Sequence, residues 1–409
     1  MPRRTMLYAA ALLLAAASAT AETKQVAALV SIYTHNSHAD VIVGKLLEGY
    51  TLNDQGEHPD LRLASLYVDQ RPAGDKSREL AGKYGFRLCD RVSDALTLGT
   101  GKLAVDGVLL VIEHGDYPLS ATEQIVYPKR KLFEQVVEVF RASGRGVPVF
   151  CDKHLADNWD DAKWFYDTAK ELHAPLMAGS SVPLTWRYPP TDVPRGAKLR
   201  EIVGVSYHIL DIYGFHGMEM LQALAERRAG GETGIRAVQC LQGAAVWDAA
   251  GRLYDQALLD AAMGRLRDRR GGDKPLREIV PDPVLFHLEY ADGLKTNLLT
   301  LNGAVAEWAA AWRDTDDHVD ATLFWTQEAR PLMHFTYLVK GVESMFHTGR
   351  PAWPVERTLL TSGALNALLT SKLRGGERLQ TPQLLLKYES DWNWRQPPDP
   401  PPGRPFTGQ

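Results

Sequence analysis

The clearest candidate for chemistry in this 409-residue chain is a short apolar stretch that ends in three polar residues. Residues 147–151 have the composition of a strand buried on both faces of a parallel sheet, and Asp152, Lys153 and His154 follow directly. In open α/β sheets, catalytic and ligand-binding groups lie just beyond the carboxyl ends of the strands. We therefore predict catalytic roles for Asp152 and Lys153; the alternative for one such triplet is a solvated turn. Because Lys153 lies beyond the strand, we expect Lys153→Ala to leave the fold intact.

Other predicted strands end in the same way, and this repetition predicts a functional cleft. The carboxyl ends of parallel strands share one edge of the sheet, so groups that follow different strands should line one crevice. The strands expected at residues 25–30, 61–68, 105–112 and 175–179 are followed by Ser31, His35, Asn36, Ser37 and His38, by Asp69, by Glu113, His114 and Asp116, and by Ser180 and Ser181.

Two chemistries fit this set of side chains. In the first, Lys153 and His216 handle the proton of a sugar hydroxyl while a nicotinamide takes the hydride, which needs groups poised near neutral pH. In the second, a divalent metal activates water or polarises a carbonyl. No H-x-x-x-H or H-E-x-x-H helical pair supports the metal, so it remains the alternative. Its candidate ligands are His35, His38, His114, Asp116, Asp152 and His154.

The elements that must position these groups form two regions. Strands and helices alternate over residues 25–181, which predicts a Rossmann-like doubly wound parallel sheet. After residue 183, consecutive strand-like runs without crossover helices predict a C-terminal α+β domain with a mostly antiparallel sheet. We assign residues 22–181 and 182–385 to these two domains. The strand-like runs of the second region are 201–207, 235–241, 244–247, 284–290, 294–301 and 321–326.

Composition restricts the class of protein and its location. A net charge of −4 without a basic stripe gives no electrostatic case for binding nucleic acid. Residues 1–21 combine a basic start, an apolar run and an A-x-A site, which predicts a cleaved signal peptide and a periplasmic or secreted protein with no further membrane contact. Residues 386–409 form a proline-rich tail, and the prolines of residues 396–409 predict that this end of it is disordered or extended.

The turn after the first strand is the expected place for a dinucleotide, but it lacks the G-x-G-x-x-G fingerprint. Its side-chain-bearing residues would crowd a pyrophosphate, although Ser37 can cap the following helix and leave its N–H groups for an anion. Asp69 ends the second strand, where such folds hold the ribose hydroxyls. The candidate cofactor-binding residues are therefore Ser31, Asn36, Ser37, His38, Asp69, Glu113 and His114.

The order of motifs resembles the glucose–fructose oxidoreductase, inositol dehydrogenase and rhizopine-catabolism family (Gfo/Idh/MocA) over about residues 25–385. Asp152-Lys153-His154 stands where that family has Glu-Lys-Pro, and residues 214–219 resemble its Gly-x-His-x-x-Asp, so the resemblance implies that Lys153 and His216 are catalytic. The family's aspartate four residues before the histidine is Ile212 here, and Asp211 is one place away.

The resemblance implies an NAD(P)-dependent oxidoreductase that acts on a carbohydrate or cyclitol. It also implies that the C-terminal sheet is open-faced and that a homo-oligomer forms through it. The departures in the glycine loop indicate a divergent, exported branch with a degenerate cofactor loop. Two other functions stay open: a cofactor-free or metal-assisted lyase or hydrolase on a carbohydrate, and a non-catalytic sugar-binding protein.

Overall fold

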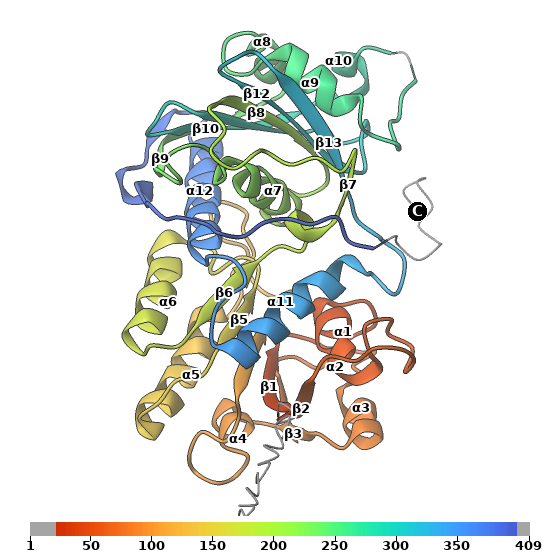
Figure 1. Cartoon of the computed structure of the whole chain (residues 1–409), viewed down its shortest axis with the longest axis vertical. Coiled ribbons are helices and arrows are strands. Elements are labelled where there is room, and N and C mark those ends of the chain that lie inside the picture. Colours follow the sequence, from red (N-terminus) through yellow and green to blue (C-terminus); the bar gives the residue numbers. More distant parts are fainter. Residues whose placement is uncertain (1–21, 273, 399–409) are drawn as a thin grey trace, which may run out of the picture.

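The computed structural model describes residues 22–272 and 274–398, and the predicted signal peptide lies outside them. Two β-sheets, each with its own helices, build the chain (Figure 1). The predicted fold class is confirmed: a six-stranded parallel sheet precedes an eight-stranded, mostly antiparallel one. No helix in the described ranges is long and apolar enough to cross a membrane.

The first sheet has the strand order β3-β2-β1-β4-β5-β6, and every neighbouring pair is parallel. The chain winds outward in both directions from β1 and β4, so the crevice between their following loops is the topological switch point. The strands are β1 (Lys24–Val30), β2 (Leu61–Val68), β3 (Arg87–Cys89), β4 (Gly107–Val111), β5 (Val149–Asp152) and β6 (Leu176–Gly179).

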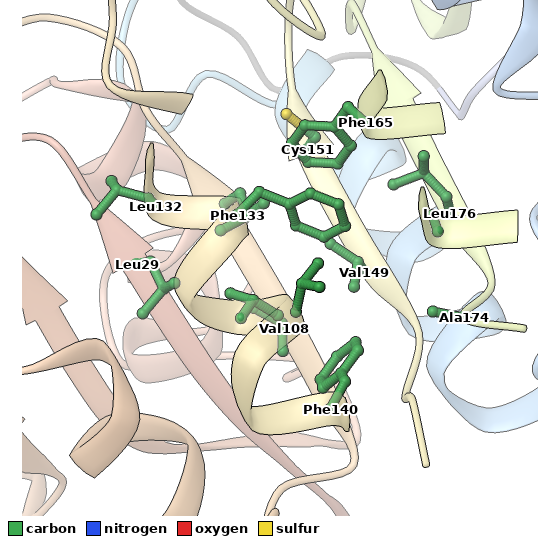
Figure 2. Packing of buried hydrophobic residues seen from close by; sticks show 14 of the residues in the cluster. Leu29, Val108, Leu132, Phe133, Phe140, Val149, Cys151, Phe165, Ala174 and Leu176 are labelled. Atoms are coloured by element: carbon green, nitrogen blue, oxygen red, sulfur yellow. The ribbon is translucent and has the colours of Figure 1, made fainter. Parts of the chain in front are cut away.

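Helices cover both faces of this sheet, which explains why its strands are apolar throughout. One face packs against α4 (Val92–Thr97), α5 (Lys129–Ser143) and α6 (Trp159–Glu171). Figure 2 shows this core, where Phe133 of α5 stacks on Phe165 of α6 at 3.7 Å between ring centroids. The other face packs against α1 (His38–Ile42), α2 (Gly44–Glu48) and α3 (Ser77–Tyr84).

The second sheet has the order β14-β9-β10-β11-β8-β12-β13-β7, and only the β8–β11 pair is parallel within it. Residues 244–247, expected to be a strand, form α8 instead, and β12 was not expected from the sequence. The strands are β7 (Trp186–Tyr188), β8 (Leu199–Ser206), β9 (Ile235–Gln242), β10 (Val284–Tyr290), β11 (Lys295–Thr300), β12 (Trp308–Asp314), β13 (Val319–Trp325) and β14 (Leu379–Gln380).

Both faces of this second sheet carry helices. One face packs on α7 (Phe215–Ala225) and α12 (Glu356–Leu373). The other face packs on α8 (Ala244–Asp248) and α9 (Gln256–Met263), with α10 (Leu276–Ile279) beside them (Figure 1). Helices therefore lie on part of the face expected to be open, and the homo-oligomer through this sheet stays a prediction.

Two C-terminal segments return to the first half of the chain. Helix α11 (His334–Thr348) packs against β1, β2 and α1 through Phe335, Leu338 and Val342. The proline-rich segment is extended over its described part, residues 386–398, and is bound to the body: Trp394 Nε1 donates to Thr185 O, and Trp392 packs beside α11. Of the two states predicted for residues 396–409, disordered or extended, the described residues 396–398 adopt the extended one.

Candidate functional site

A cavity of about 340 Å³ lies at the carboxyl edge of the first sheet and is closed by the second domain. Its walls come from the loops after β1 and β4, from the start of α7, and from the segment that precedes α11. Five histidines reach it: His38, His114, His208, His216 and His334. The strand-end groups that the sequence predicted to converge do so here, with the exceptions described below.

Lys153 is buried behind the cavity wall in an ionic network. Its Nζ donates to Oε2 of Glu113, which lines the cavity. His38 Nδ1 lies 2.6 Å from Asp152 Oδ2 and 3.2 Å from Glu113 Oε2. Burial raises the pKa of Glu113, but His38 and Lys153 outweigh it and hold that pKa well below its ordinary value. Glu113 therefore stays an anion at the cavity wall.

A residue that the sequence reasoning missed fixes the loop after β5. Lys129 is buried at the start of α5, and its Nζ donates to the backbone oxygens of Asp152, Lys153 and His154. Burial lowers the pKa of Lys129. The only sequence signal was a lysine at the start of a predicted amphipathic helix, which is usually a solvated residue.

His216, at the second position of α7, is oriented by β6. Its Nδ1 lies 2.5 Å from Ser180 Oγ, which also accepts the N–H of Val182. Burial, followed by the charge of Lys153, lowers the pKa of His216 well below 6.5, so the ring is neutral at neutral pH.

Glu219 supports this arrangement one turn further along α7. It accepts hydrogen bonds from the Ser180 N–H at 3.3 Å and from Thr361 Oγ1 at 2.8 Å. A Cβ atom at Gly179 (φ +129°) would lie 2.7 Å from Glu219 Oε2, so this close approach requires glycine. Glu219 therefore positions the strand end that holds His216.

Aromatic rings complete the cavity, and no sequence pattern indicated one of them, Trp308. Trp308 of β12 stacks on Tyr213 at 5.6 Å between centroids, and the ring of His216 lies 5.9 Å away. Trp308 is 4% exposed, and within the described residues its indole Nε1 has no hydrogen-bond partner. A buried N–H without a partner is costly, and Trp308 lines the cavity, so a ligand oxygen that reached this N–H would be bound favourably.

His154 and Asp211 pair away from the cavity wall. His154 Nε2 lies 3.2 Å from Asp211 Oδ1, and Asp211 also accepts the Ile125 N–H. Although burial raises the pKa of Asp211, His154 holds it below the ordinary value. Asp211, one place from the family position, therefore anchors the loop that carries His154.

The start of α1 holds a neutralised ionic cluster. Ser37 caps the helix, and the buried carboxylate of Asp40 accepts the Asn36 N–H at 2.9 Å. Asp40 also binds Lys76 at 2.6 Å and Arg330 at 2.7 Å, and Arg330 binds Glu48 as well. An internal carboxylate thus occupies the first turn of the helix that would otherwise be free to bind an anion.

The crevice above β1 is bridged by the chain's own contacts. Gln70 exchanges two hydrogen bonds of 2.9 Å with the backbone of Asp116, which joins the loops after β2 and β4. The carboxylate oxygens of Asp69 accept the hydroxyls of Tyr67 and Tyr117, at 3.0 and 2.8 Å. Ser31 is also engaged, since its hydroxyl donates to Glu113 O.

The predicted alternative metal ligands fall into two groups. His38 and His114 lie together with Glu113, and donor atoms of all three lie within 4.8 Å of one another. The others are elsewhere: His35 is 68% exposed and lies 3.8 Å from Asp40, Asp116 is bound to Gln70, and His154 is paired with Asp211. The sixth candidate, Asp152, pairs with His38 at 2.6 Å, and a metal site built from all six residues is therefore excluded.

Comparison with known proteins rests on structure, because no protein-family model and no curated protein matches the sequence. GenD2 of gentamicin A biosynthesis, solved with NAD, covers 93% of this chain and 99% of its own, with a TM-score of 0.56 and 14% identity. A myo-inositol dehydrogenase of Sinorhizobium meliloti, so named provisionally, matches with a TM-score of 0.54 and 14% identity over 88% and 99% of the two chains. The aldose-aldose oxidoreductase of Caulobacter crescentus matches with a TM-score of 0.52 and 16% identity, over 87% of this chain and 99% of its own.

The chain has the Gfo/Idh/MocA fold. The identities of 14–16% establish this fold alone. In the Gfo/Idh/MocA fold, a dinucleotide would lie across the switch point, with its pyrophosphate at the start of α1 and a ribose at Asp69.

The residues present do not fit a dinucleotide in that position. The first turn of α1 is occupied by Asp40 and its cations, the Asp69 oxygens are bound to two tyrosines, and the Gln70–Asp116 bridge crosses the crevice. Of the seven predicted cofactor-binding residues, Asn36, His38, Glu113 and His114 line the cavity, whereas Ser31, Ser37 and Asp69 are engaged internally.

Proposed function

We propose that this protein is an enzyme that acts on a carbohydrate or cyclitol by acid–base chemistry in the His216 cavity, without a dinucleotide. The observation that carries the proposal is the joint placement, in one cavity between the domains, of a neutral histidine, an ionised glutamate and an unsatisfied indole N–H. Perturbed titratable groups that share a cleft mark functional sites.

His216 is the proton acceptor in this proposal. Its ring is neutral, Ser180 fixes its Nδ1, and the residue lines the cavity, so Nε2 is the nitrogen left to meet a substrate. A positioned neutral imidazole removes a proton from a hydroxyl or from a carbon next to a carbonyl, a contribution of about 10²–10⁴-fold in rate. Burial, and after it the charge of Lys153, lowers the pKa of His216 and keeps the ring neutral before it takes the substrate proton.

The cavity suits a small polyhydroxylated molecule. Its volume of about 340 Å³ lies at the lower end of the roughly 300–1,000 Å³ usual for ligand pockets. The stacked rings of Tyr213 and Trp308 offer an apolar surface for a sugar ring, and the wall of His38, Glu113 and His114 offers polar partners for its oxygens. The similarity to a myo-inositol dehydrogenase and an aldose-aldose oxidoreductase supports the same class of substrate.

The second candidate function is oxidoreduction with NAD or NADP, favoured by the likeness to GenD2 solved with NAD. It requires the contacts that close the crevice above β1 to open before a dinucleotide enters. A non-catalytic sugar-binding protein is the third candidate, which the buried Lys153–Glu113 pair does not favour, because binding alone needs no such pair.

The test is turnover of a panel of glycosides, free sugars and cyclitols, with products identified by NMR and mass spectrometry. We expect a product without added NAD(P), lost in His216→Ala and retained in His318→Ala, a matched histidine that is 81% exposed. A product that forms only with NAD(P), together with reduced cofactor, would replace the leading proposal with the second candidate. Sugar binding without any product would instead support the third candidate, a non-catalytic sugar-binding protein.

A further inference from the structure

We propose that His38, Glu113 and His114 bind one divalent transition-metal cation, and that this cation holds a substrate oxygen in the cavity. The ligand set is a property of the protein alone, whereas the role toward substrate rests on the function proposed above. Two imidazoles and a carboxylate are the ligands of many catalytic zinc sites, which keep a further position for water or substrate.

The three side chains come from two loops that meet only in the folded chain. His38 begins α1, whereas Glu113 and His114 follow β4, and β1 and β4 are neighbours. Each residue offers a donor atom within 4.8 Å of the donors of the other two, and the rings of His38 and His114 meet edge to face at 5.3 Å. Bonds of about 2.0–2.2 Å to one zinc ion need donors roughly 3.5 Å apart, so small side-chain rotations close the site.

Asp152 prepares His38 as a ligand. Its Oδ2 lies 2.6 Å from His38 Nδ1, so that nitrogen carries the proton and Nε2 keeps the free lone pair. Histidines that bind metals almost always donate their other ring N–H to a carboxylate or carbonyl, which fixes the tautomer and the ring orientation. This hydrogen bond is a second observation, independent of the cluster of donors, that points to a cation.

Glu113 has an oxygen for the cation. Its contacts to Lys153 and to His38 both involve Oε2, and Oε1 takes part in neither. The Lys153 ammonium is bound to Oε2 and stabilises the negative charge of the carboxylate. A cation on the cavity side sits where all three ligands line the wall.

The cation would make the polar wall an electrophile for the His216 reaction. A divalent metal polarises a carbonyl or hydroxyl oxygen and stabilises the negative charge that develops when a nearby base removes a proton. With that cation bound, the cavity would hold both a base and a Lewis acid, a combination that can drive an elimination from a sugar.

The test is calorimetric titration of Zn²⁺, and of Mn²⁺ in parallel, into chelator-treated protein, with elemental analysis of the protein as purified. We expect one cation per chain with a micromolar or tighter Kd, weakened at least about 100-fold in His114→Ala and in His38→Ala. Asp152→Asn keeps the three ligands and should weaken binding by about 10–100-fold. His208→Ala, in the same cavity but outside the cluster, is the control and should leave Kd unchanged.

Circular dichroism and Tm establish that each variant is folded before titration, and His114→Ala carries the test if His38→Ala unfolds. Binding that is absent at millimolar cation, or equally strong in His114→Ala and wild type, overturns the metal site. Since the titration contains no sugar, a bound cation in a protein that turns over no sugar contradicts the proposed function and leaves the metal site standing.

Discussion

Lys153 Nζ donates a hydrogen bond to Glu113 Oε2, and both side chains are at most 3% exposed. Lys153 follows β5 and Glu113 follows the neighbouring strand β4. The predicted catalytic lysine is thus bound to a glutamate that the sequence analysis had assigned only to cofactor binding. The sequence alone led us to expect that Lys153→Ala leaves the fold intact. Because of this buried pair, we now expect the substitution to destabilise the fold.

Lys153→Ala should lower the free energy of unfolding by about 3–5 kcal/mol, because it leaves the buried Glu113 carboxylate without its ammonium partner. Urea unfolding followed by circular dichroism measures this. The double variant Lys153→Met, Glu113→Gln removes both charges and should recover a large part of the loss. Equal stability of the wild type and Lys153→Ala would show that the pair is not formed.

The histidine ring of His216 should remain neutral at pH 6, because its pKa lies well below 6.5. As the pH falls below 6.5, the unfolded chain binds this proton before the folded chain does. The stability associated with His216 is therefore complete above pH 6.5 and is lost below it. Ring ¹⁵N chemical shifts measure the charge, with the signal assigned by its absence from His216→Gln; a protonated ring at pH 6 would refute the burial argument.

Trp308→Phe should raise KM about tenfold and leave kcat nearly unchanged, because the ring surface remains and only the N–H that meets a substrate oxygen is lost. Steady-state kinetics with the first substrate found measures this. Trp312→Phe, on the same strand but outside the cavity, is the matched control. A Trp308→Phe enzyme with wild-type KM would remove the indole from the binding site.

Lys129→Met should lower the free energy of unfolding by about 3 kcal/mol, since a buried carbonyl left without a donor costs roughly 1–3 kcal/mol and Lys129 serves three. Lys131→Met, two residues along α5 and exposed, should change stability by less than about 0.5 kcal/mol. Similar denaturation midpoints for the two variants would show that Lys129 does not hold the loop after β5.

The sequence predicted the first sheet well because its information is local. Each strand is an apolar run that ends in polar residues, and strict alternation with helices leaves few possible topologies. In the second region these local patterns mislead. Residues 244–247 have the composition of a strand but form a helix that begins after Gly243. Strand β12 contains three consecutive alanines and so lacks the composition typical of a strand.

For the candidate site, the sequence predicted which edge carries the chemistry but not the partners. Convergence of His38, Glu113 and His114 follows from the order of the strands. The contacts of Lys129, Trp308 and Arg330 depend on packing between segments up to 290 residues apart, which no local pattern contains. Arg330, which comes from a loop of the second region, binds Asp40 and so helps to neutralise the carboxylate at the start of α1.

The most direct test of the account is calorimetric titration of NAD and NADP into the purified protein. Because Asp40, Asp69 and the Gln70–Asp116 bridge occupy the dinucleotide position of this fold, we predict no binding heat up to about 1 mM of either cofactor. A micromolar Kd that is weakened by Asp69→Asn would contradict the account and restore the nicotinamide-dependent oxidoreductase.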